Sequence, residues 1–248
     1  MSPATHSAND LYVSSADGGL PPVWFLVPEG FFALPVAATA EERAERAHSF
    51  VRELYSRGDE TVWEPAAPYY AAIAELMADT GVSYAAMGLF STVEEEATSE
   101  EAVVRHEPAN GVAQCAFTVA TVATDQEDGD TDVVAQGILA ALSSDPYNDA
   151  IWLDLPCGPA VSCISLREYR ISPEATASGE ETKLLTGQIQ VHVPFPTGPF
   201  TAIFTLYTAS MQQWAEIYRL MSSILQTVSF IDPAEDRPDS PTASADES

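Results

Sequence analysis

The segment at residues 200–231 constrains the fold more than any other part of the chain. It reads FTAIFTLYTASMQQWAEIYRLMSSILQTVSFI. Its first part has apolar or β-branched residues at both alternating sets of positions, which is typical of a strand covered on both sides. Its second part repeats apolar residues at steps of three and four, which predicts an amphipathic helix. The expected helical stripe consists of Met211, Trp214, Tyr218, Met221, Leu225 and Val228. Ser210 and Gln213 form a capping-box pattern at its start. This segment indicates an α+β core that closes near the C-terminus.

The rest of the chain predicts further strands and helices. Strands are expected at residues 23–27, 31–34, 82–92, 112–124, 150–156, 161–171 and 184–195. Helices are expected from Thr39 to Gly58, from near Pro68 to Gly81, and over residues 131–142. The buried faces of the first two helices are expected at Ala44, Ala47, Val51 and Leu54, and at Tyr69, Ile73, Leu76 and Met77. Because neighbouring strands have short connections, they should pair antiparallel. We therefore expect an α+β fold with a largely antiparallel central sheet and helices on both faces.

Composition divides the chain into one domain and two ends. Residues 1–20 are small and polar, and residues 232–248 consist mainly of Asp, Pro, Ser, Ala and Glu. Such sequences bury too little apolar surface to fold, so we expect a disordered N-terminal arm and a disordered acidic tail. Residues 21–231 should form a single α+β domain, since 248 residues with 46% hydrophobic content are ample for one core.

The formal net charge of −27, from 37 acidic and 10 basic residues, excludes several classes of partner. Nucleic acids and anionic membranes are bound through basic residues, and this chain has a single lysine, Lys183. Two interpretations remain. The acidity keeps the protein soluble, or it attracts a protein partner with a basic surface.

No secretory signal is visible, and no apolar run approaches the roughly 20 residues that span a bilayer, so a cytoplasmic location is expected. In that compartment cysteines stay reduced. Cys115 lies in an apolar strand pattern and should be buried. Cys157 and Cys163 flank the Gly158-Pro159 dipeptide, where a hairpin could bring them together. We expect three thiols, with a 157–163 disulfide as the alternative.

Two pieces of the chain resemble the Mog1/PsbP-like group, which includes the LpqN-type proteins. They are the Val27-Pro28-Glu29-Gly30-Phe31 turn after the first strand, and residues 202–230, where the final strand passes into a helix that ends in Ser-Phe. Two helices intervene after the first strands, where that group has one. The resemblance implies a binding or accessory domain without catalysis, and it transfers no functional residue.

Clustered carboxylates are the best candidates for a metal site, and they fail the test of spacing. Residues 125–132 are rich in Asp, but Thr124, Gln126 and Ala135 occupy positions where an EF-hand requires acids. A second acidic cluster comprises Glu94, Glu95, Glu96, Glu100 and Glu101. Both are typical of solvated loops. The histidines, His6, His48, His106 and His192, do not have metal-ligand spacing. We predict no metal and no cofactor.

Three functions remain open. The first is a non-catalytic, acidic interaction or adaptor domain, which the charge and the resemblance favour. The second is a small-ligand binder with a pocket between sheet and helices, lined by Trp24, Trp152, Tyr207 or Trp214. The third is an unrecognised hydrolase. No G-x-S-x-G, P-loop or G-x-G-x-x-G motif occurs, so no catalytic residue is assigned.

Overall fold

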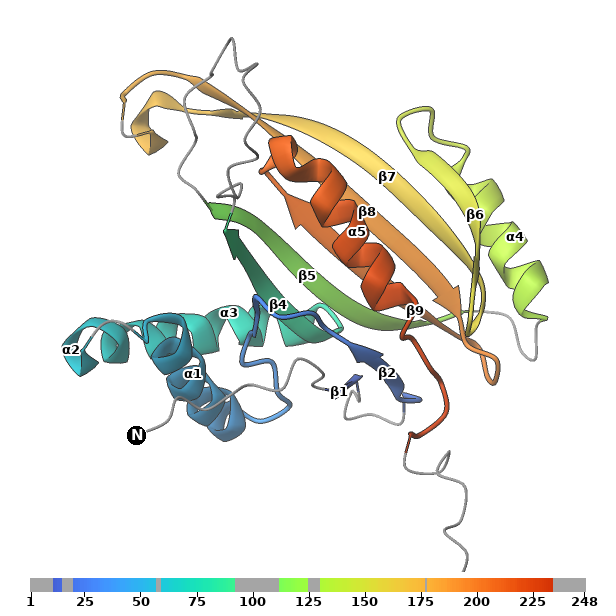
Figure 1. Ribbon diagram of the computed structural model, residues 1–248, viewed down its shortest axis with the longest axis horizontal. Coiled ribbons are helices and arrows are strands. Elements are labelled where there is room, and N and C mark those ends of the chain that lie inside the picture. Colours follow the sequence, from blue (N-terminus) through green and yellow to red (C-terminus); the bar gives the residue numbers. More distant parts are fainter. Residues whose placement is uncertain are drawn as a thin grey trace, which may run out of the picture.

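The computed structural model describes residues 11–14, 20–56, 59–91, 112–124, 130–176 and 178–233. Within these residues the architecture is α+β, with a seven-stranded antiparallel sheet at its centre (Figure 1). The expected fold class is confirmed.

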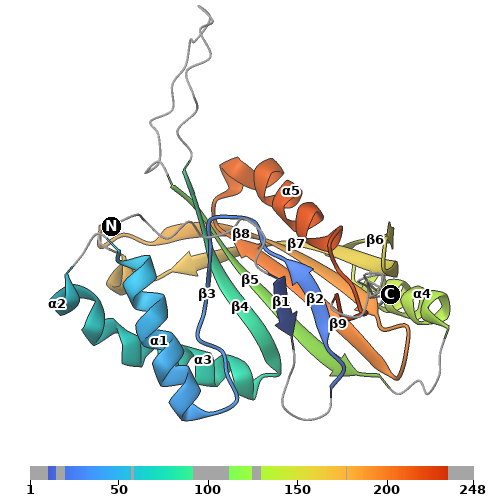
Figure 2. The ribbon, with the colours of Figure 1, turned by 60° about the horizontal axis from the view of Figure 1, so that its bottom comes forward.

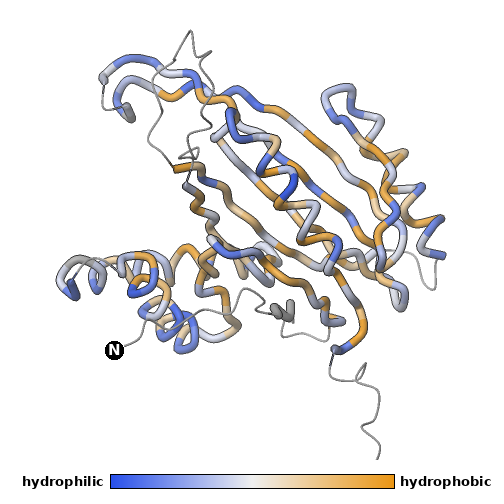
Figure 3. The backbone as a smooth tube through the Cα atoms, viewed as in Figure 1, coloured by the Kyte–Doolittle hydropathy of each residue, from blue (hydrophilic) through white to orange (hydrophobic). Residues whose placement is uncertain are grey.

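The sheet has the strand order β3-β4-β5-β9-β8-β7-β6, and every neighbouring pair is antiparallel. The strands are β3 (Phe31–Ala33), β4 (Val82–Ser91), β5 (Val112–Ala123), β6 (Asp149–Leu155), β7 (Gly158–Ile171), β8 (Thr182–Pro194) and β9 (Phe200–Thr208). All seven lie within one to three residues of the predicted strands. Along β5 and β8, buried positions alternate with more exposed ones, because successive side chains point to opposite faces. Figure 3 maps the hydropathy of each residue on the backbone.

One face of the sheet, called here the α5 face, carries the main hydrophobic core. Helix α5 (Trp214–Leu225) packs on it through Ile217, Met221, Ile224 and Leu225. Strand β2 (Val23–Leu26) lies beside α5 and pairs with β1 (Leu11–Ser14) in a separate two-stranded sheet. Phe25 of β2 is fully buried and makes edge contacts with the rings of Tyr84, Phe117 and Phe204.

The other helices cover the opposite face at its two ends (Figure 2). Helices α1 (Ala40–Leu54) and α3 (Ala67–Asp79) pack together over β3 and β4, preceded by the short α2 (Glu60–Trp63). Helix α4 (Thr131–Leu142) lies over β7, β8 and β6. Thr39 caps α1 at the residue where the sequence predicts that this helix begins, and Asp130 caps α4, both through side-chain oxygens.

The buried faces of three helices differ from the prediction. In α1, Ala44 is exposed, whereas Arg43 and Phe50 are buried beside Ala47 and Val51. In α3, Tyr69 and Leu76 are 66% and 68% exposed, and Ala67 and Ala74 are buried instead. Ala67 packs against Ala47, Phe50 and Val51 of α1, and Ala74 packs against Val36 and against Ala85 of β4. In α5, Tyr218 is exposed and Ile224 is buried.

The start of α5 also differs. A 3₁₀ turn, Met211–Gln213, precedes the helix, and Ser210 makes no capping bond to it. The Ser210 Oγ instead accepts a hydrogen bond from the Gln114 N–H of β5, 3.0 Å away. The neighbouring strand competes successfully for the serine, which a local sequence pattern cannot show.

The N-terminal residues and the cysteines also bear on the expectations. Leu11–Ser14, inside the arm expected to be disordered, form β1 because this apolar stretch pairs its backbone with β2. All three cysteines are free thiols. Cys157 packs against the α5-face core, whereas Cys163 pairs with Gln190 in a register that points it to the opposite face. The alternative of a 157–163 disulfide is therefore wrong.

Candidate interaction surface

Strand β6 forms one edge of the sheet, and among the described residues its only strand neighbour is β7. No residue of β6 is fully buried. Ile151, Leu153 and Leu155 point to the α5 face, and Ala150, Trp152 and Asp154 point to the opposite face. The strand thus offers a backbone edge with no partner among the described residues, exposed at Ile151 on the α5 face and next to α4 on the opposite face.

Apolar side chains beside this edge are exposed on the α5 face. Ile151, Leu166 and Leu185 are 43%, 56% and 45% exposed, and Ile164 between them is half-buried. The register places them together: Ile164 lies opposite Asp149, Ser162 opposite Ile151, and Leu166 opposite Gly187. Cross-strand and diagonal neighbours on one face are within contact reach. The β6–β8 patch is therefore defined as Ile151, Ile164, Leu166 and Leu185.

Helix α5 borders the patch. Tyr218 is 37% exposed, and the half-buried Trp214 ring covers Gly187, where a Cβ atom would overlap the ring. A small hollow of about 130 Å³ lies between the helix and β6. It is lined by Leu153, Asp154, Leu155, Ser162, Ile189, Val191, Tyr218, Met221, Ser222, Leu225 and Gln226. The helix packs over the core, and Ile151, Leu166 and Leu185 stay exposed beyond it.

Charged residues surround the patch. Asp149 lies next to Ile151 at the β6 end, and Lys183 Nζ pairs with Glu168 Oε1 at 2.9 Å beyond Leu185. An apolar centre with a charged rim is the usual anatomy of a protein–protein contact. The patch has the side-chain chemistry to bind another protein by burial of apolar area.

The opposite face carries a polar network. His192 lies 3.1 Å from Gln190 Oε1, and the Gln190 amide lies 3.5 Å from Thr205 Oγ1. Burial lowers the pKa of His192, because desolvation disfavours the imidazolium. The recorded partner of His192 is an amide and not a serine, thiol or carboxylate. This arrangement gives no support to a hydrolase, which needs such a pair in a cleft.

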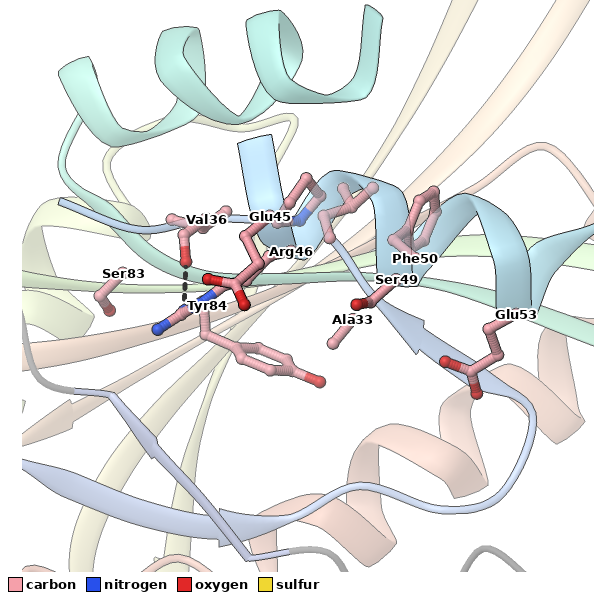
Figure 4. A pocket seen from close by; sticks show the side chains of 11 residues that line it. Ala33, Val36, Glu45, Arg46, Ser49, Phe50, Glu53, Ser83 and Tyr84 are labelled. Atoms are coloured by element: carbon pink, nitrogen blue, oxygen red, sulfur yellow. Dashed lines mark hydrogen bonds between the residues drawn. The ribbon is translucent and has the colours of Figure 1, made fainter. Parts of the chain in front are cut away.

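A cavity of about 540 Å³ lies between α1, the segment after β3, and β4 (Figure 4). Glu45, Ser49 and Glu53, four residues apart on α1, line one side, and the ring of Tyr84 extends into it from β4. Arg46 Nη1 donates to the carbonyl oxygen of Val36 at 2.8 Å and fixes the segment after β3 against the helix. Ala33, Leu34, Pro35, Phe50 and Ser83 complete the lining. The volume is within the range of small-molecule sites.

The acidic clusters contribute little to the described structure. No group of three or more potential metal ligands occurs in the described part of the chain. Residues 125–129, the acidic cluster from Glu94 to Glu101, and His106 lie outside it. Asp130, from the same acidic run, accepts a hydrogen bond from the Asp132 N–H at 3.0 Å and caps α4.

The four aromatic residues predicted to bind a ligand lie on separate parts of the fold. Trp24 is buried in β2, where its backbone pairs with Ser229. Trp214 lies on the α5 face, and Trp152 and Tyr207 point to the opposite face from β6 and β9. None lines the 540 Å³ cavity. Trp214 does border the β6–β8 patch, and Trp152 belongs to its edge strand.

Sequence reasoning missed the patch itself. Ile151, Leu166 and Leu185 occur in alternating strand patterns that are the same for covered and uncovered faces. The signal that distinguishes them is tertiary, because the reach of α5 across the sheet decides which strands are shielded.

Neither a model of any protein family nor any curated protein matches the chain. The Mog1/PsbP-like resemblance therefore stays a prediction, while the α+β fold that it implies is present. No helix in the described ranges is both long enough and apolar enough to cross a bilayer.

Proposed function

We propose that this chain is an acidic protein-binding domain that contacts its partner through the β6–β8 patch. The observation that carries the proposal is the run of exposed apolar side chains, Ile151, Leu166 and Leu185, beside an unpaired edge strand. Contiguous exposed apolar surface on a protein commonly marks a contact with another protein.

Charge and resemblance support the same function. The net charge of −27 favours a partner with a basic surface, because complementary charge accelerates encounter and selects the partner. The Mog1/PsbP-like resemblance implies an accessory or binding role. We further propose a cytoplasmic location, which the three free thiols support, because cysteines stay reduced in that compartment.

Affinity capture with matched variants tests the proposal. The double variant Leu166→Gln/Leu185→Gln removes apolar area and leaves the charge unchanged. Val133→Gln on α4 is the control, since Val133 is 56% exposed, as Leu166 is, and lies away from the patch. We expect the wild type and the control to retain the same protein at low salt, and the double variant to lose it. Equal retention by all three would reject the patch as the contact.

Small-ligand binding is a second candidate function, favoured by the 540 Å³ cavity beside α1. Its lining combines polar groups from one helix face, Glu45, Ser49 and Glu53, with apolar residues that include Leu34 and with the ring of Tyr84 (Figure 4). Such mixed lining suits a small cationic molecule with an apolar body.

Filling the cavity tests this candidate. Ser49→Trp projects an indole into the space from an exposed helix position. A library of small organic amines should contain compounds that raise the melting temperature of the wild type and not that of the variant. Compounds that shift both proteins equally bind elsewhere and would rule out this cavity as the ligand site.

A further inference from the structure

We propose that β6 accepts an extended, basic segment of the partner protein as an added strand of the sheet. The inference rests on the proposed function and specifies the contact: the partner's backbone pairs with Asp149–Leu155. Strand addition is a general mode of peptide recognition in which main-chain hydrogen bonds supply affinity and alternate side chains supply specificity.

The edge has the properties that strand addition requires. Strand β6 is regular along its whole length and pairs with β7 in unbroken register from Asp149 to Leu155. No bulge or proline interrupts it until Pro156, which lies after the strand. Proteins usually protect such edges with bulges, prolines or a covering element. Here two aspartates, Asp149 and Asp154, are the charged residues of the strand.

The two faces of β6 specify the side chains of an incoming strand. On the α5 face, Ile151 and Leu153 extend the β6–β8 patch to the edge, so alternate residues of the added strand should be apolar. On the opposite face, Trp152 Nε1 donates to Asp154 Oδ1 at 2.9 Å, which holds the ring beside the carboxylate. A tryptophan face and a carboxylate together favour a cation, above all arginine. The preferred segment therefore alternates apolar and basic residues.

The negative charge of this chain favours another protein as the partner at β6 and disfavours a second copy of this chain. Two copies paired through β6 would bring Asp149 and Asp154 of each strand to one interface, between molecules of net charge −27 each. Like charges across strands are destabilising. Residues 94–107 and 232–248 of this chain contain more acidic than basic residues and are disfavoured in the same way. A basic partner is the occupant that this edge complements.

Selection from a display library of random dodecapeptides tests the proposal with the full-length chain. The expected enriched peptides alternate apolar with Lys or Arg. Their binding should slow backbone hydrogen exchange in Asp149–Leu155. A proline at the centre of an enriched peptide should abolish binding, because it removes a ladder donor and breaks the extended pairing.

The double variant Asp149→Asn/Asp154→Asn keeps the side-chain shape and one acceptor oxygen at each position, and it removes the two charges. Two partly exposed ion pairs contribute about 1 kcal/mol together, so the variant should bind enriched peptides about fivefold more weakly. Unchanged circular dichroism would show that the variant is folded. Equal affinity of wild type and variant, or enriched peptides without basic residues, would overturn the charge argument.

The outcomes separate this inference from the proposed function. Enriched peptides that lose affinity with Leu166→Gln/Leu185→Gln, but leave exchange in β6 unchanged, would reject strand addition and leave the patch as the contact. If selection enriches no binder, or only peptides insensitive to both double variants, the proposed surface fails together with the strand addition.

Discussion

Gly187 shows at the scale of single residues how the fold positions the candidate surface. It lies in β8 between Leu166 and Thr208 of the neighbouring strands, and the Trp214 ring occupies the space above it. Only a residue without a side chain leaves room for the ring at that point. The glycine thereby sets where α5 begins and where the exposed patch starts.

Gly187→Ala should destabilise the protein by about 2 kcal/mol, because the new methyl group overlaps the Trp214 ring and overpacks the contact. Urea unfolding measures the change, and a red shift of tryptophan emission should accompany it. The matched control is Gly137→Ala in α4, where nothing lies within 4 Å of the added carbon. That variant should gain about 0.5–1 kcal/mol from helix propensity. A stabilised Gly187→Ala protein would show that the ring does not rest on this glycine.

His192 should make the free energy of unfolding depend on pH. Its pKa in the folded protein is lowered by burial, so the unfolded chain binds the proton more readily. The stability conferred by neutral His192 is therefore present above the unfolded pKa of about 6.5 and is lost as the pH falls below it. The free energy of unfolding should drop more between pH 7 and pH 5 in the wild type than in His192→Gln. Parallel curves for the two proteins would contradict this prediction.

Burial should also suppress the reactivity of the thiols. It raises the pKa of Cys115 to about 12, and it raises the pKa values of Cys157 and Cys163 as well. The thiolate is the reactive form, so little of it is present at pH 8. An aromatic disulfide reagent should label the native protein slowly at this pH and all three thiols rapidly in denaturant. Fast labelling of Cys115 in the native state would show that its strand opens readily.

At the scale of elements, the attachment of α1 depends on one buried arginine. Arg43 is 9% exposed and donates from Nη1 to the carbonyl oxygens of Ala37 and Ala38, each 2.9 Å away. Its Nη2 lies 3.4 Å from Glu75 Oε1 of α3. Glu75 is exposed, so this ion pair contributes little to stability. These contacts tie the helix to the segment before it and to the second helix, and so hold one wall of the 540 Å³ cavity.

Arg43→Met should cost about 2–3 kcal/mol of stability, because two charge-assisted hydrogen bonds are lost. Arg52→Met, on the same helix, makes the same chemical change at an exposed residue that lies 5.3 Å from the centre of the Trp63 ring. It should cost less than about 1 kcal/mol. Chemical denaturation compares the two variants, and equal losses would show that Arg43 does not anchor the helix.

Elements were easier to predict from the sequence than their arrangement. The alternation of β8 and the Asp130 cap of α4 are local signals, and both give the element bounds closely. In α3, Tyr69 and Leu76 were expected to be buried because they are apolar, but the contacts with α1 and with β4 bury Ala67 and Ala74 instead. Which apolar face is covered depends on neighbours distant in the sequence, and local periodicity contains no record of them.

At the scale of the whole molecule, coverage of the sheet is uneven. Helix α5 and β2 shield the central strands on one face, and α1, α3 and α4 shield the ends of the other (Figure 2). The β6–β8 patch remains where the cover of α5 ends. In the sheet, β9 pairs with β5, which is distant in the sequence, and β6 is left at the edge. This strand order depends on contacts between distant segments, so the sequence alone could not place the patch.

Titration of the captured partner into purified protein tests the central claim most directly. The wild type and Val133→Gln should bind with the same affinity. Leu166→Gln/Leu185→Gln should bind about thirtyfold more weakly, since two half-exposed leucines contribute about 1 kcal/mol each when they are buried at a contact. Equal dissociation constants for all three proteins would contradict the claim that the β6–β8 patch binds the partner.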